Sequence, residues 1–238
     1  MADFTPLISR LSQVRSLFAL HIAAQGASAT LTDTLYELAY KVKQIPSGIQ
    51  YVRSGYQLFK GNTSLSKLPA YLDFRQLTSM YQMCYGCTAL TQVGVLETAN
   101  VTNMMWAFYG CETLTRIDGL DTSAITSASE LFHGCSSLVT IVQPLDFSNV
   151  TSQIDTTFTA CRNLESVSFT GAISVDIWVN GCPKLTLESL LSLLNALAEG
   201  VTDKTCTLGT KNLAKLSETQ KAIATSLSLI HISEPTRL

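Results

Sequence analysis

Charged residues are scarce in this sequence. Of its 238 residues only 14% are charged, and the 16 Lys and Arg residues are scattered rather than gathered on one stripe. With a formal net charge of −2 the chain lacks the basic surface that nucleic-acid binding needs, so we expect no nucleic-acid partner. No apolar run reaches the roughly 18–20 residues of a membrane helix, so we expect no membrane span.

Catalytic motifs are also missing. His21 and His133 are the only histidines outside the C-terminal tail, and neither belongs to a Ser/His/Asp or Cys/His spacing. Glycine-rich phosphate loops are absent as well. We therefore expect a protein that is not an enzyme and that uses no cofactor.

Internal repetition is the strongest pattern that is present. The stretch FYGCETL (108–114) returns as LFHGCSSL (131–138), and more loosely as YGCTAL (85–90) and FTACRNL (158–164). The cysteine of each copy is taken as the origin of a repeat, and an earlier copy, LFKGNTSL, has Asn in its place. Six origins result, about 24 residues apart: Asn62, Cys87, Cys111, Cys135, Cys161 and Cys182.

Other residues also recur at fixed distances from these origins, and each set of equivalent positions is called a column. Leucines recur three residues after each origin, apolar residues recur six residues after the first five origins, and a second element, L-[DE]-x-x-x-[LVI]-T, begins at Leu72, Leu96, Leu120 and Leu145. The apolar positions after the origins indicate a short strand. The Thr-Ser or Thr-Asn pairs are N-cap candidates for a short helix. A glycine before the next origin is expected to end that helix. We predict an α/β repeat fold: a leucine-rich-repeat-type solenoid of about six coils, with a parallel sheet on one face and short helices on the other.

The columns resemble the BspA-like leucine-rich repeats of bacterial surface proteins, whose units read like NVT.M..MF.GC.SL. The closest copy here is NVTNMMWAFYGCETL (100–114), and the resemblance extends from about Gly55 to Leu185. It implies adhesion at a bacterial surface. Ala160 replaces the glycine of the motif in one later copy.

The flanks suggest three further segments. Residues 1–48 show two stripes of apolar residues at helical spacing and are predicted to form a helical hairpin. This hairpin is similar to small N-terminal modules of phage tail and surface proteins. A signal peptide at 15–29 is the alternative. The repeats occupy 49–185, and 186–226 are predicted as a truncated cap with a helix from Thr186, a strand at KTCTLGT and a helix after Ser217. The stretch LSLIHISEPTR (227–237) resembles a translated sequencing adapter, so 227–238 are expected to be an artefact.

The cysteines invite a chemical interpretation, but their spacing favours a structural one. One thiol per repeat forms a column, whereas zinc needs four ligands converging on a point. Because Asn62 stands at the same position, we predict a ladder of small interior side chains that hydrogen-bond the backbone: Asn62, Cys87, Cys111, Cys135, Cys161 and Cys182. Disulfides between neighbouring repeats and a metal site are the alternatives. Likewise, Asp73, Glu97, Asp121 and Asp146 either cap their turns or bind a cation.

Variable columns remain as the candidate binding surface. Its members are predicted at positions two and five residues before the origin, and five and seven after it: Tyr85, Trp106, Tyr109, His133, Gln92, Arg116 and Asp118. We expect an extracellular binding module on a bacterial surface or phage virion, recognising a host surface protein or glycan. A structural virion spacer that contacts only other virion proteins is the alternative.

Overall fold

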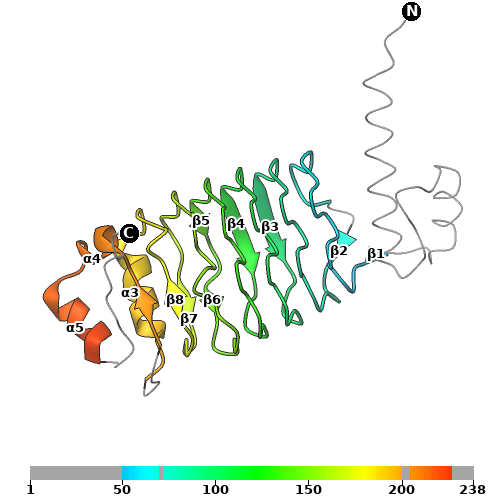
Figure 1. Cartoon of the computed structure of the whole chain (residues 1–238). Coiled ribbons are helices and arrows are strands. Elements are labelled where there is room, and N and C mark those ends of the chain that lie inside the picture. The colour runs from blue at the N-terminus through cyan, green and yellow to red at the C-terminus, as the bar shows by residue number, and fades with distance from the viewer. Residues whose placement is uncertain (1–49, 70–71, 200–203, 227–238) are drawn as a thin grey trace, which may run out of the picture.

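The computed structural model describes residues 50–69, 72–199 and 204–226 (Figure 1). Successive repeats lie side by side, and each contributes short strands that run in parallel with those of its neighbours. The predicted helical hairpin at 1–48 and the predicted artefact at 227–238 lie outside the described residues. No described helix has the length and apolar character needed to cross a membrane.

Within the described residues, nine strands form four small sheets, and every pairing is parallel. The nine strands are β1 (Gln50–Tyr51), β2 (Leu72–Asp73), β3 (Gln92–Leu96), β4 (Arg116–Leu120), β5 (Thr140–Ile141), β6 (Leu145–Asp146), β7 (Phe169–Thr170), β8 (Ile177–Trp178) and β9 (Cys206–Thr207). They pair in the orders β1-β2, β3-β4-β5, β6-β7 and β8-β9. The register advances by one repeat, so that Val93 lies opposite Ile117 and Ile117 opposite Ile141.

The predicted fold class is wrong. The described residues contain only three helices, α3 (Leu187–Ala196), α4 (Thr210–Leu213) and α5 (Glu218–Ser226), and all three follow the repeats instead of covering one face of them. The parallel sheet is divided into sheets of two or three strands, so the predicted solenoid of six coils with one sheet and a helical wall is not found.

Left-handed backbone explains why the predicted short helices do not form. We call the stretches before the origins, such as 79–86 and 103–110, turn segments. Those before Asn62, Cys87, Cys111 and Cys135 contain a residue with positive φ five positions before the origin, for example 51° at Gln82 and 56° at Trp106, where an α-helix requires about −60°. The backbone N–H groups donate to the next repeat instead: Gln82 N to Met105 O at 3.0 Å and Cys84 N to Ala107 O at 2.7 Å.

Proline and an added residue explain why the sheet is divided. Leu72 and Leu145 follow their origins by ten residues, whereas Leu96 and Leu120 follow theirs by nine. Both longer repeats contain a proline just before that leucine, Pro69 or Pro144. Proline fixes φ and has no N–H, so strand pairing is interrupted there.

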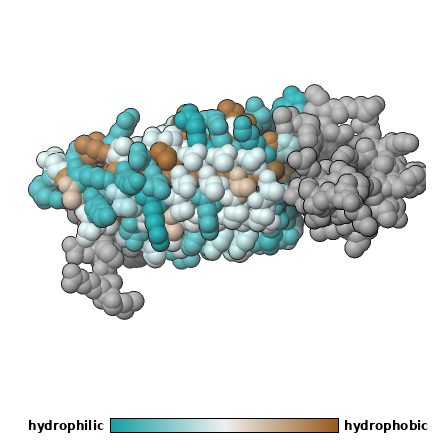
Figure 2. Space-filling view, turned by 90° about the horizontal axis from the view of Figure 1, so that it is seen from above, coloured by the Kyte–Doolittle hydropathy of each residue, from teal (hydrophilic) through white to brown (hydrophobic). Residues whose placement is uncertain are grey.

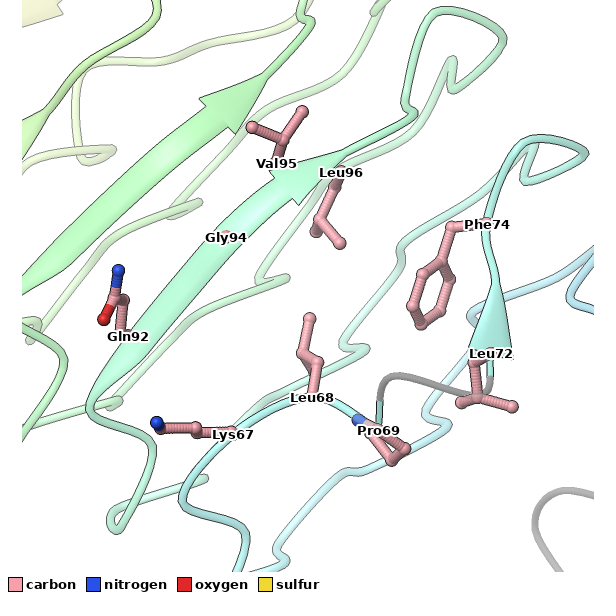
Figure 3. A pocket seen from close by; sticks show the side chains of 9 residues that line it. All are labelled: Lys67, Leu68, Pro69, Leu72, Phe74, Gln92, Gly94, Val95 and Leu96. Carbon is pink, nitrogen blue, oxygen red and sulfur yellow. The ribbon is translucent and has the colours of Figure 1, made fainter.

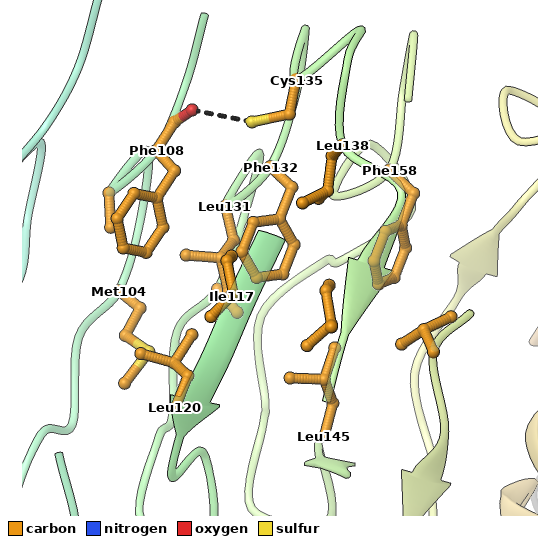
Figure 4. Close-up of a cluster of buried hydrophobic side chains, with 14 of the residues drawn as sticks. Met104, Phe108, Ile117, Leu120, Leu131, Phe132, Cys135, Leu138, Leu145 and Phe158 are labelled. Carbon is orange, nitrogen blue, oxygen red and sulfur yellow. Dashed lines mark hydrogen bonds between the residues drawn. The ribbon is translucent and has the colours of Figure 1, made fainter. Parts of the chain in front are cut away.

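A single hydrophobic core runs through all the repeats, from Val52 to Leu216. Phenylalanines three positions before the origin stack along it, with ring centroids 6.0 Å apart for Phe108 and Phe132 and 5.8 Å for Phe132 and Phe158 (Figure 4). The leucines three positions after the origin are buried, as predicted, and Leu114 and Leu138 among them are fully buried. Repeats therefore share their apolar surface with both neighbours.

The C-terminal segment forms the predicted cap elements. Helix α3 begins after Thr186, whose side chain accepts a hydrogen bond from Ser189 N, and α5 follows Ser217, whose hydroxyl accepts one from Gln220 N. The buried Asn212 amide donates to the carbonyls of Val179, Cys182 and Leu208. Backbone acceptors at this end of the core are thereby satisfied.

We predict that Gly134→Ala lowers the free energy of unfolding by about 1–2 kcal/mol, the cost of placing an L-residue in left-handed backbone. Gly134 has φ of 76°, and an added Cβ would make only ordinary contact with Gly110 Cα at 3.5 Å. Gly94→Ala is the control, because Gly94 has open space and no positive φ. Urea unfolding measures both, and equal midpoints would contradict the assignment of strain to Gly134.

Candidate binding surface

The turn segments present some of their side chains to the core and others to the surface. In the segment before Cys87, Met80, Met83 and Cys84 are buried, whereas Tyr81 and Tyr85 are only half-buried. The same positions recur in the next repeats because the backbones are hydrogen-bonded in register. Surface side chains at one position therefore line up from repeat to repeat.

One such line is the tyrosine column, formed by Lys60, Tyr85, Tyr109 and His133. The rings of Tyr85 and Tyr109 are stacked with centroids 4.6 Å apart, and those of Tyr109 and His133 are 4.7 Å apart. At the other end, Lys60 Nζ lies 5.3 Å from the Tyr85 ring centre, a cation–π contact. The predicted residues Tyr85, Tyr109 and His133 are thus brought together.

A second line, the tryptophan column, consists of Tyr56, Tyr81 and Trp106. Tyr56 and Tyr81 are stacked at 5.1 Å, and Tyr81 meets Trp106 edge to face at 5.5 Å. Tyr56 is 60% exposed. The sequence pattern predicted Trp106 as a surface residue but did not predict Tyr56 and Tyr81. Both stand six positions before an origin, and this shared position could have identified them.

Polar groups lie at both ends of the tyrosine column. Gln82 Oε1 accepts from Gln57 Nε2 at 2.6 Å and from Lys60 Nζ at 2.7 Å. At the far end, His133 Nδ1 lies 3.5 Å from Glu130 Oε2 but makes no hydrogen bond within the described residues. The column therefore carries one cation at its beginning and one carboxylate at its end.

The other three predicted surface residues lie together on the strand side of the core. Gln92 Nε2 donates to Asp118 Oδ2 at 2.9 Å, and Arg116 Nε donates to Asp118 Oδ1 at 2.5 Å. The hydrogen bond from Arg116, assisted by that from Gln92, lowers the pKa of the Asp118 carboxyl. The candidate residues therefore form two separate groups, one aromatic and one polar.

The surface at the edge where β3 and β4 begin is weakly polar. Seen from that edge, most of the described residues have hydropathy near the middle of the scale, with scattered hydrophilic side chains (Figure 2). The turns there are built from Gly, Ser and Thr residues. A partner on this side would contact hydroxyl and backbone groups. It would not meet a strong electrostatic potential of one sign.

The cysteine column lies inside the core. Five thiols each donate to a backbone carbonyl of the preceding repeat, as Cys135 Sγ does to Phe108 O at 3.1 Å (Figure 4); the others are Cys87, Cys111, Cys161 and Cys182. Asn62 differs, because its Oδ1 accepts from Ser64 N in its own turn. All seven cysteines are free and buried. Burial raises the pKa of the Cys206 thiol to about 12 and that of Cys111 well above its ordinary value, which favours the neutral thiol over a reactive thiolate.

The aspartates of the acidic column cap their own turns. Asp73 Oδ1 accepts from Arg75 N at 2.9 Å, Asp121 Oδ1 from Ser123 N at 2.9 Å, and Asp146 Oδ1 from Ser148 N at 2.8 Å. Glu97, the fourth member, is exposed. In the described ranges no three His, Cys, Asp or Glu side chains gather as metal ligands would.

Residues 52–169, just under half of the chain, match the model of a family described as "Mycoplasma protein of unknown function, DUF285". This family is associated with BspA-like surface repeat proteins. No curated protein and no solved structure matches the chain.

The raised thiol pKa predicts a pH-dependent stability. Because Cys206 ionises near pH 9 in the unfolded chain and near pH 12 in the folded one, its contribution is complete below pH 9 and is lost as the pH rises toward 12. Between pH 8 and pH 10 the wild type should lose about 1 kcal/mol relative to Cys206→Ala, measured by urea unfolding at each pH. A constant difference between the two proteins would show that Cys206 ionises normally when folded.

Proposed function

We propose that this chain is a non-enzymatic binding module of a BspA-like surface repeat protein, displayed on a bacterial surface or carried on a phage tail. Its partner is a host surface protein or glycan. The observation that carries the proposal is the alignment of six aromatic side chains, those of the tyrosine and tryptophan columns, on one wall of a rigid backbone.

Rigidity supports a binding role. Tyr109 is held between Tyr85 and His133, so it has little rotamer freedom to lose when a partner docks. Aromatic anchors that are fixed before binding lower the entropic cost of association. A surface that served only to keep the repeats in water would be built at lower cost from charged side chains.

Charge supports a neutral partner. Along the tyrosine column the described residues place one cation, Lys60, at one end and one carboxylate, Glu130, at the other. The central ring, that of Tyr109, has both faces covered by neighbouring rings, so it offers a partner its edge and its hydroxyl group. Such groups recognise neutral hydrogen-bonding surfaces, which both proteins and glycans provide.

The test compares Tyr85→Ala/Tyr109→Ala with wild type for binding to a glycan array and to intact host cells. The double variant should lose at least 2 kcal/mol, roughly 30-fold in affinity, if these rings are central to the interface. Thr159→Ala is the matched control, because Thr159 occupies the same position two repeats further along and carries no ring. Tyr109→Phe keeps the stack and reports on the hydroxyl alone.

Folding is checked separately by urea unfolding, because each lost stacking pair costs about 0.5–1.5 kcal/mol. A wild type that binds nothing across both panels, yet is incorporated into virions, would favour a structural spacer. Binding that the double variant retains in full would place the interface elsewhere on the molecule.

A further inference from the structure

A groove separates the first repeat from β3 on the strand side of the core. Its volume is about 390 Å³, and Figure 3 shows Leu68 and Leu96 pointing toward one another across it, with Phe74 at one end and Lys67 and Gln92 at the other. Val95, at its rim, is 71% exposed, the most exposed of the large hydrophobic residues described. The groove belongs to neither aromatic column.

Backbone pairing is interrupted at this groove. In later repeats, Val142 N donates to Ile117 O and Ile141 N to Ser166 O, both at 2.9 Å. The equivalent bonds between the first two repeats would join Gly94 N to Leu68 O and Leu68 N to Gln92 O. Neither bond forms within the described residues, so β3 pairs there with β4 alone.

Pro69 lies beside the interruption, and Leu72 N donates to Pro69 O at 3.2 Å. Because the first repeat makes neither of these bonds within the described residues, the edge of β3 is open next to Gly94, which has no side chain to cover the backbone. Open strand edges with apolar surroundings are templates for another extended chain.

We propose that this groove binds an extended peptide segment of a partner protein, which adds to β3 as a parallel or antiparallel strand and places an aliphatic side chain between Leu68 and Leu96. The open N–H of Gly94 and the open C=O of Gln92 match a peptide backbone, and the apolar lining selects the side chain. The volume is at the lower end of the roughly 300–1,000 Å³ of ligand sites, large enough for one or two side chains.

The experiment uses the full 238-residue chain and a phage-displayed library of random dodecapeptides, followed by fluorescence anisotropy with the selected peptides. Gly94→Phe fills the groove without backbone strain, because nothing lies within 4 Å of a Cβ at Gly94 and its φ is not positive. Val142→Phe is the matched control, since Val142 stands at the same position two repeats later and is also exposed. We expect at least tenfold weaker binding for Gly94→Phe and unchanged binding for Val142→Phe.

A second measurement does not depend on the folding of any variant. Peptides with N-methyl groups on alternate residues keep their side chains but cannot donate the backbone hydrogen bonds of a strand, so wild type should bind them at least tenfold more weakly. Absence of selected peptides, or binding that survives both Gly94→Phe and N-methylation, would overturn the proposal. Tyr85→Ala/Tyr109→Ala should leave peptide binding intact, which separates this site from the aromatic one.

Discussion

The hydrogen bonds between the backbones of successive repeats are the constraint on which the rest of the structure depends. In the turn segments before Asn62, Cys87, Cys111 and Cys135, alternate N–H groups donate to carbonyls of the following repeat, as those of Cys84 and Gly86 do at 2.7 Å. These bonds fix the distance between repeats near the 4.7–4.9 Å of neighbouring strands. Side chains at equivalent positions must therefore lie at that spacing, both in the core and on the surface.

Stacking of rings follows directly from this spacing. Tyr85, Tyr109 and His133 have centroids 4.6 and 4.7 Å apart because their backbones are held that far apart. The same constraint places each of the five thiols of the cysteine column within 3.0–3.4 Å of a carbonyl in the preceding repeat. A residue substituted in one repeat thus acts on two neighbours, and the binding surface and the core share one geometry.

Much of this arrangement could be predicted from the sequence, because residues at the same position of successive repeats lie next to one another in the structure. The phase of Leu114 and Leu138 identified the core, and Thr186 identified the start of α3. The helical wall was wrong because Gln82 and Trp106 adopt positive φ, which their residue type does not disclose. The division of the sheet could have been predicted from Pro69, because proline interrupts strand pairing.

The candidate surface was predicted only in part for a related reason. Residue type and phase pointed to Tyr85, Tyr109 and His133, but periodicity alone does not show that their faces are covered by one another. The open edge of β3 could not be found from sequence, because it depends on hydrogen bonds that the first repeat fails to make. Departures from the repeat, not the repeat itself, create that groove.

The direction of the hydrogen bonds has a consequence for the length of such a protein. In the turn segments N–H groups donate forward, as Trp106 N does to Ser129 O, whereas the N–H groups of Thr102 and Thr115 donate backward, to Thr78 O and Thr91 O. An α-helix aligns all its peptide dipoles and collects partial charge at its ends. Here the dipoles of hydrogen bonds that point forward oppose those of hydrogen bonds that point backward. Further repeats could therefore be added without building up an end-to-end dipole.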